Sequence, residues 1–332
     1  MAPRGHSDWL YAFQDDDEWV LMCGHGLQNI VQDLKNPKRQ YPSIVLMVGR
    51  GGKSAAQKAM FLQSNRPKSR GCSIAQLNVV PTTAASENPL LIADVDLDNA
   101  YRGHYPPRDH ARQSRCRVEW TGNTAPNDLV DAIFARLILL FADVVCLFID
   151  DFTNFEDAFV HLQRWTKSGA NFSRPWKPRV ILVTRRSRVT KDIPDMPALE
   201  IQQVTLSSGT SSPATRHRYL RDAIFQQVSL VREARDTCHM LFSATHLTVL
   251  FEMALQHTAK SIIDEFSFIR ATRQHNKMDE QFVYHLETFL QLCAENQASK
   301  EFILRYVASA ILMDSLPPEM HRKSSGYYTF LY

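Results

Sequence analysis

Short apolar runs alternate with helix-forming stretches over the first two thirds of the chain. A continuous apolar run bounded by turn-forming residues is typical of a strand that is buried on both faces of a sheet. Such runs lie at 44–48, 77–80, 90–95, 144–149, 180–184 and 201–206. Helix-forming stretches lie among them at 55–63, 128–141 and 153–167. This alternation predicts an α/β domain over residues 43–212, with a doubly wound, mostly parallel sheet.

The pattern changes after residue 212. Apolar residues recur with the period of a helix in four stretches, at 216–235, 243–272, 279–295 and 299–314. We therefore predict an all-helical region over residues 213–332. Residues 1–42 have no clear period and are interpreted as a lead-in segment. The chain ends on a run of aromatic residues at Tyr332, so we expect it to continue in a longer protein.

Composition narrows the possible functions. There are 38 Lys and Arg residues against 35 Asp and Glu, a net charge of +3, whereas a nucleic-acid binder has a clear basic excess. We therefore expect no nucleic-acid partner. The six cysteines lie far apart without a C-x-x-C pair, which favours reduced thiols in a cytoplasmic protein. The most apolar stretch, 133–149, contains Arg136 and Asp143, so no membrane span is expected.

A glycine-rich turn follows the first strand of the α/β region. The sequence after residue 48 reads Gly-Arg-Gly-Gly-Lys-Ser, the outline of a phosphate-binding loop. Glycines allow backbone N–H groups to turn toward phosphate oxygens, the lysine reaches the outer phosphates, and the serine hydroxyl coordinates Mg²⁺. We therefore expect nucleotide contacts from Gly49, Gly51, Gly52, Lys53 and Ser54.

The loop departs from the full pattern. G-x-x-x-x-G-K-[ST] places its first glycine where Met47 stands, so the loop is two residues short if Gly49 opens it. A shorter loop offers fewer N–H groups to a phosphate. A plain strand-turn-helix connection therefore remains the alternative interpretation.

Asp94 is the candidate metal ligand. It ends the strand 90–95, and ligands bind at the carboxyl ends of parallel strands. Together with Ser54 it predicts a Mg²⁺ site that serves ATP or GTP, with Thr82 or Thr83 as a further ligand. Any activity would then be slow nucleoside-triphosphate hydrolysis.

Two GTPase features are incomplete. The chain resembles a GTPase-type P-loop fold, but the D-x-x-G motif that begins at Asp94 has Leu97 in place of glycine. After the strand 180–184 there is no carboxylate to read guanine, so guanine specificity is not expected. A rival interpretation treats Asp150 and Asp151 as the metal residues of a signalling-type ATPase. Alternatively, these two residues only end a strand.

Several segments carry a resemblance to a known family. The chain looks like the N-terminal region of large fungal patatin-like phospholipase proteins in the segments 42–49, 52–54, 135–148, 179–184, 241–246 and 308–318. The resemblance implies that a lipid acyl hydrolase domain follows this region. The chain itself has no G-x-S-x-G elbow, so it contains no lipase dyad.

Four functions remain open at this point. The first is a degenerate nucleotide-binding regulatory module of a larger fungal patatin-like protein. The others are a pseudo-NTPase scaffold that binds proteins without nucleotide, a signalling-type ATPase, and an accessory region of a hydrolase whose catalytic domain lies elsewhere. In each case we expect a protein partner or further domains of a longer chain.

Overall fold

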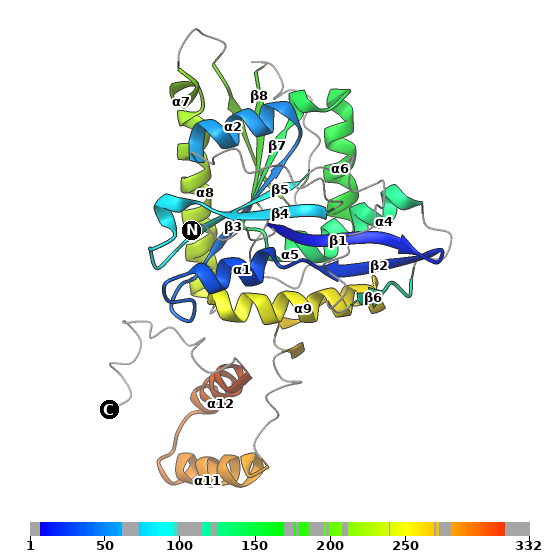
Figure 1. Cartoon of the computed structure of the whole chain (residues 1–332). Helices are drawn as coiled ribbons and strands as arrows, with labels where there is room; N and C mark the ends of the chain where they lie inside the picture. Colours follow the sequence, from blue (N-terminus) through cyan, green and yellow to red (C-terminus); the bar gives the residue numbers. More distant parts are fainter. Residues whose placement is uncertain are drawn as a thin grey trace. The chain divides into compact units, whose positions relative to one another are not determined.

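A nine-stranded sheet runs through the first of the two compact units of the chain, residues 1–266 and 267–332 (Figure 1). The computed structural model describes residues 7–61, 73–95, 97, 115–120, 125–168, 176, 179–185, 196, 199–207, 212–238, 240–268, 270–271 and 280–315. The strands are β1 (Asp8–Asp15), β2 (Glu18–Cys23), β3 (Ser43–Val48), β4 (Ser73–Val79), β5 (Leu90–Val95), β6 (Arg115–Arg117), β7 (Val144–Phe148), β8 (Arg179–Thr184) and β9 (Glu200–Thr205).

The sheet is mixed, with the order β6-β2-β1-β4-β5-β3-β7-β8-β9. The strands β5, β3, β7, β8 and β9 run parallel, whereas β4, β1, β2 and β6 are joined by antiparallel pairings. The predicted α/β class is therefore confirmed, and the predicted parallel pairing holds for one half of the sheet.

The antiparallel half comes largely from the stretch 1–42, which the sequence presents as a lead-in segment. There β1 and β2 form a hairpin whose turn is Asp16 and Asp17, both with positive φ, 47° and 65°. Aspartate tolerates this conformation better than most residues, and a two-residue turn with positive φ matches the twist of a hairpin. The acidic run 15–18, which lies between Trp9 and Trp19, thus contains the turn of this hairpin.

Helices cover the sheet. In this unit they are α1 (Gly26–Asp33), α2 (Gly51–Phe61), α4 (Pro126–Ile133), α5 (Leu139–Phe141), α6 (Phe155–Ser168), α7 (Pro213–Arg216), α8 (Arg218–Thr237) and α9 (Ala244–Lys260). A π-helical turn, Phe134–Ile138, joins α4 to α5, and 3₁₀ turns lie at Pro81–Thr83 and Ile149–Asp151. One core cluster joins α2 and α8 to alternate residues of the parallel strands, such as Val45 and Met47. The intervening Ile44 and Leu46 are also buried, so both faces of β3 are covered.

The boundary between the two units places α8 and α9 with the sheet. The second unit contains α11 (Phe282–Glu295) and α12 (Lys300–Ser315). Their aromatic rings pack together, with the centroids of Phe289 and Tyr306 4.8 Å apart. In the described part of the chain, no helix has both the length and the apolar character that crossing a bilayer requires.

Candidate phosphate-binding loop

The glycine-rich loop lies at the carboxyl edge of the parallel strands. Only Gly49 and Arg50 separate the end of β3 from the start of α2. In the sheet, β3 lies between β5 and β7. After β3 the chain continues to β5 on one side and later crosses to β7 on the other side, so the loop after β3 lies at the topological switch point of the sheet. Open α/β sheets bind their ligands at such points. The structure also brings Asp94 and Asp151 to this edge.

A carboxylate of the protein itself occupies the loop. Asp151 follows β7 in the 3₁₀ turn Ile149–Asp151. Its Oδ2 accepts hydrogen bonds from the backbone N–H groups of Arg50 at 2.7 Å and Lys53 at 2.9 Å. Its Oδ1 accepts from the N–H of Gly52 at 2.8 Å. These three donors belong to the loop and to the first turn of α2, where a phosphate-binding loop receives its phosphate.

The glycines fit the carboxylate closely. Gly49 has φ of +147°, which L side chains rarely adopt, and a Cβ there would lie 2.7 Å from Asp151 Oδ2. A Cβ on Gly52 would lie 2.8 Å from Asp151 Oδ1. A Cβ on Gly51 would meet no atom within 4 Å. Gly49 and Gly52 thus allow the carboxylate of Asp151 to approach the loop, whereas Gly51 does not face it.

The Lys53 side chain has partners within the protein. Its residue is only 3% exposed, and its Nζ donates to the carbonyl of Val95 at 2.7 Å and forms an ion pair with Asp94. The sequence predicts a phosphate contact for Lys53 and a Mg²⁺ contact for Asp94. The structure brings the two residues together, and their charges compensate each other.

The predicted hydroxyl ligands also make internal contacts. Ser54 Oγ donates to the carbonyl of Arg50 at 3.0 Å. Thr83 Oγ1 donates to the carbonyl of Val80 and accepts from the N–H of Leu90, so it stabilises the turn before β5. Among the residues that the structure describes, no three His, Cys, Asp or Glu side chains are placed to hold a metal ion. Magnesium binding by Ser54 and Asp94 remains a prediction.

Asp150 and Asp151 point to different strands. Asp150 accepts from Thr184 Oγ1 at 3.2 Å and from the N–H of Arg185 at 2.6 Å, so it ties the end of β7 to the end of β8. The two carboxylates suggested in the sequence as one metal pair therefore act separately here. Asp150 holds neighbouring strands, and Asp151 fills the loop.

A small cleft opens beside the loop. Its volume is about 260 Å³, slightly below the usual range for pockets that take drug-sized ligands. It is lined by Val48, Gly49, Arg50, Leu97, Asn127, Asp151, Phe152, Thr153, Asp157, Val160, His161 and Arg164. The cleft thus borders Asp151 and the residues that follow it.

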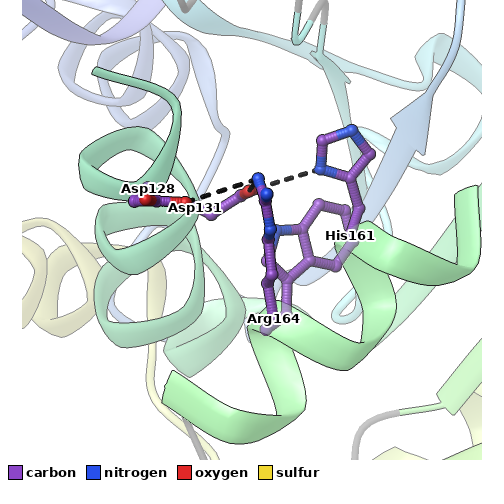
Figure 2. Close-up of polar contacts among 5 residues, drawn as sticks. Asp128, Asp131, His161 and Arg164 are labelled. Carbon is purple, nitrogen blue, oxygen red and sulfur yellow. Dashed lines mark hydrogen bonds and ion pairs between the residues drawn. The ribbon is translucent and has the colours of Figure 1, made fainter. Parts of the chain in front are cut away.

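A buried aspartate organises the helices behind this cleft. Asp131 of α4 is 1% exposed, and its carboxylate accepts from Trp165 Nε1 at 2.8 Å and Arg164 Nη1 at 3.1 Å. His161 Nδ1 lies 3.1 Å from the same carboxylate, as Figure 2 shows. The cluster joins α4 to α6. The sequence did not predict this cluster, and its only local signal is the pair Asp128 and Asp131, one turn apart in a helix that is otherwise largely apolar.

Among the described cysteines, Cys23 and Cys146 are buried thiols. Five described cysteines, 23, 116, 146, 238 and 293, are unpaired, while Cys72 lies outside the described residues. Burial raises the pKa of the Cys23 thiol to about 12 and also raises the pKa of Cys146. Both thiols stay protonated and unreactive near neutral pH.

Neither a scan against protein-family models nor a search of the curated proteins finds a match to this sequence.

Proposed function

We propose that this chain is a pseudo-NTPase: a degenerate P-loop domain that serves as an interaction or regulatory module of a larger protein and does not hydrolyse nucleotide. The observation that carries the proposal is the carboxylate of Asp151 on the three N–H groups of the loop. A phosphate and this carboxylate need the same donors and carry charge of the same sign, so they exclude each other.

The fold supports descent from a nucleotide-binding domain. The parallel strands β5, β3, β7, β8 and β9, with the antiparallel β4 beside β5, resemble a GTPase-type P-loop fold. The loop follows the central strand at the switch point, where such domains bind phosphate. Together with the resemblance to fungal patatin-like proteins, this favours a regulatory domain that accompanies a catalytic domain elsewhere in a longer chain.

The contacts of Lys53 Nζ also support the proposal that nucleotide binding has been lost. To reach an outer phosphate, its Nζ has to leave both Asp94 and the carbonyl of Val95, which are its contacts in a buried position. The Asp94 side chain is 26% exposed but that of Lys53 only 4%, so breaking this ion pair is costly because it leaves the buried lysine charge without compensation. Triphosphate binding therefore has to displace Asp151 and also reorganise Lys53.

A nucleotide-binding regulatory module with Mg²⁺ and ATP or GTP is the second candidate. One observation favours it: Lys53 and Asp94, the two residues that phosphate and Mg²⁺ binding require, lie together at the loop. In that case Asp151 closes the loop only in the absence of nucleotide.

Titration of fluorescent ATP and GTP analogues with Mg²⁺ separates the two candidates. We expect no saturable binding to the wild-type chain and no difference between wild type and Lys53→Ala. A matched variant, Lys58→Ala, removes an exposed lysine from the same helix. Saturable binding to wild type that Lys53→Ala abolishes and Lys58→Ala keeps would sink the pseudo-NTPase proposal and establish the nucleotide-binding module.

A further inference from the structure

We propose that the outer edge of β9 is an interaction surface on which a second copy of this chain adds its own β9, so that two sheets join into one across a two-fold axis. β9 is the last strand at one side of the sheet, and the surface does not involve the glycine-rich loop. The inference therefore goes beyond the proposed function and does not depend on it.

The first observation is that β9 is an edge strand. Among the described residues its strand partner is β8 alone, and the two pair in parallel from Glu200 to Thr205 without a register shift. All residues of β8 except Arg179 are buried, whereas Val204 is the only buried residue of β9. An edge strand presents a row of backbone N–H and C=O groups that can pair with another strand.

The two edges of the sheet differ in their protection against pairing. At the other edge, β6 has only three residues, Arg115–Arg117, and its two arginines form ion pairs with Asp15 and Glu18. A short strand with charged side chains is a common means of preventing edge pairing. β9 has six residues, contains no lysine, arginine or proline, and has no bulge. It therefore keeps the geometry that strand addition uses.

Every second residue of β9 points its backbone groups toward the outer edge. The N–H of Leu206, directly after β9, donates to the carbonyl of Thr184 in β8 at 2.7 Å. In an extended strand, successive residues direct their N–H and C=O groups to alternate sides, so every second residue counted back from Leu206 faces β8. The residues between them, Ile201, Gln203 and Thr205, direct their N–H and C=O groups outward.

These three outward residues are arranged symmetrically about Gln203. A two-fold axis through this position, perpendicular to the sheet, sets Gln203 opposite Gln203 of the second copy and Ile201 opposite Thr205 of the second copy. They form the hydrogen-bonded pairs of an antiparallel ladder, because both members of each pair direct their N–H and C=O groups toward the other strand. The edge is thus complementary to itself, which favours a second copy of this chain as the added strand.

The side chains are compatible with this register. Gln202 lies opposite Val204 of the second copy. Glu200, the only charged residue of β9, lies opposite Leu206 of the second copy. Like charges directly opposite each other destabilise a sheet, and none meet here.

Gln203 provides an independent observation. Its side-chain Oε1 is buried and has no hydrogen-bond partner among the described residues, while its Nε2 donates to Thr205 Oγ1 at 3.4 Å. Opposite side chains in an antiparallel pair lie about 5 Å apart at Cβ. Because an amide nitrogen carries two N–H groups, the Gln203 amide of the second copy can donate to this oxygen. The two-fold register therefore supplies the missing partner.

A hollow beside β9 leaves room for the added strand. Its volume is about 390 Å³, and it is lined by residues 202–205 of β9 and by residues of α8 that include Tyr219. The Tyr219 residue is 75% exposed. A strand added to β9 covers part of this ring, and tyrosine is enriched at protein interfaces because its ring is apolar and its hydroxyl can stay hydrated.

Sedimentation equilibrium of the 332-residue chain tests the inference. We expect wild type to form dimers with a Kd of the order of μM, as for a small interface. Gln203→Lys places two like charges opposite each other at the axis and is expected to raise the Kd at least about tenfold. Gln14→Lys makes the same change at an exposed position of β1 and should leave the Kd unchanged. A monomeric wild type, or a Gln203→Lys chain that dimerises like wild type, would overturn the inference.

A charge exchange tests the register. Gln203→Glu alone is expected to weaken the dimer as Gln203→Lys does. In an equimolar mixture of the two variants, opposite charges face each other across the axis, so heterodimers should form at least as tightly as the wild-type dimer. A mixture that associates no more tightly than either variant alone would refute the two-fold pairing at position 203.

Proline tests the backbone pairing. Gln203→Pro removes an outward N–H group and leaves the ladder to β8 intact, and proline is tolerated in edge strands. Each dimer then loses this donor twice, so the Kd is expected to rise at least about tenfold while the circular dichroism spectrum stays that of wild type. Gln202→Pro removes an N–H group on the β8 side and is expected to disrupt the fold. A folded Gln203→Pro chain with the wild-type Kd would overturn the inference, and if this variant does not fold, the charge exchange decides.

Discussion

An aspartate accepts hydrogen bonds from backbone N–H groups at each end of the parallel strand β7, and the two aspartates differ in their exposure to solvent. At the amino end, Asp143 precedes β7 and accepts hydrogen bonds from the N–H of Ile44 at 3.0 Å and from Arg235 at 2.7 Å. At the carboxyl end, Asp151 follows β7 and accepts hydrogen bonds from the N–H groups of the loop. The Asp143–Arg235 pair is buried, with side chains 2% and 7% exposed, whereas Asp151 is half-buried and Arg50 beside it is exposed.

Because of this difference in burial, the contacts of Asp143 are structural, whereas those of Asp151 can be replaced. Arg235 is enclosed further by aromatic rings, with its guanidinium 5.6 Å from Trp176 and 5.4 Å from Phe242. Water cannot easily take over the contacts of Asp143. At the loop, the hydrogen bond from the Arg50 N–H is exposed and those from Gly52 and Lys53 are partly buried, so water has more access to the donors that Asp151 occupies. The carboxylate of Asp143 therefore maintains the fold, whereas that of Asp151 can be replaced more easily by solvent.

Asp143→Ala tests the amino end of β7 and has the largest expected effect on the free energy of unfolding. It leaves the Arg235 charge and the Ile44 N–H without their acceptor in a buried position, which typically costs about 3–5 kcal/mol. Urea unfolding of the full chain measures the loss. Glu301→Ala, which removes an exposed helical ion pair with Arg305, is the control and should cost less than about 0.5 kcal/mol. A loss for Asp143→Ala as small as that of the control would remove the contrast between the two ends.

Asp131→Ala has the next largest expected effect. Its carboxylate serves three side chains that join α4 to α6 (Figure 2). Removing it leaves the buried Trp165 N–H without an acceptor, and we expect a loss of about 2–4 kcal/mol of unfolding free energy. Glu156→Ala, which removes an exposed carboxylate from the start of α6, is the matched control. If urea unfolding shows equal losses for both variants, the cluster is not a structural junction.

The sequence was informative about strands and much less so about contacts between them. The apolar runs at 44–48, 90–95 and 144–149 became β3, β5 and β7 nearly as predicted, since a strand that is buried on both faces has few polar positions. The hairpin β1–β2 was missed because an acidic turn separates its strands of 8 and 6 residues in a stretch of mixed character.

The candidate site was predictable only in part for the same reason. The glycines, Lys53 and Asp94 were found by local pattern, and they do lie together. The entry of Asp151 into the loop depends on a 3₁₀ turn about a hundred residues away, and no local pattern reports such a contact. The pairing of Asp143 with Arg235 is equally remote in sequence.

Asp151→Ala should affect stability much less than Asp143→Ala. The three N–H groups lose their acceptor, but the Arg50 donor is exposed and the other two are only partly buried, so water can take the place of the carboxylate and we expect a loss of only about 1 kcal/mol. Urea unfolding in a phosphate-free buffer measures it, with Asp150→Ala beside it. A loss of unfolding free energy equal to that of Asp143→Ala would show that the carboxylate of Asp151 also makes structural contacts.

The smallest effects come from Gly51→Ala and Gly52→Ala, which isolate the contribution of Asp151. Alanine is favoured over glycine within a helix by about 0.5–1 kcal/mol, and Gly51 has open space for a methyl group, so Gly51→Ala should stabilise slightly. Gly52→Ala has the same helical gain but expels the Asp151 carboxylate from its 2.8 Å contact, so the net change should be close to zero. In the Asp151→Ala background nothing remains to be expelled, and Gly52→Ala should then stabilise as Gly51→Ala does. A double-mutant cycle by urea unfolding measures this coupling between positions 52 and 151, which we expect to be about 1 kcal/mol, and a coupling of zero would mean that the carboxylate does not occupy the loop in solution.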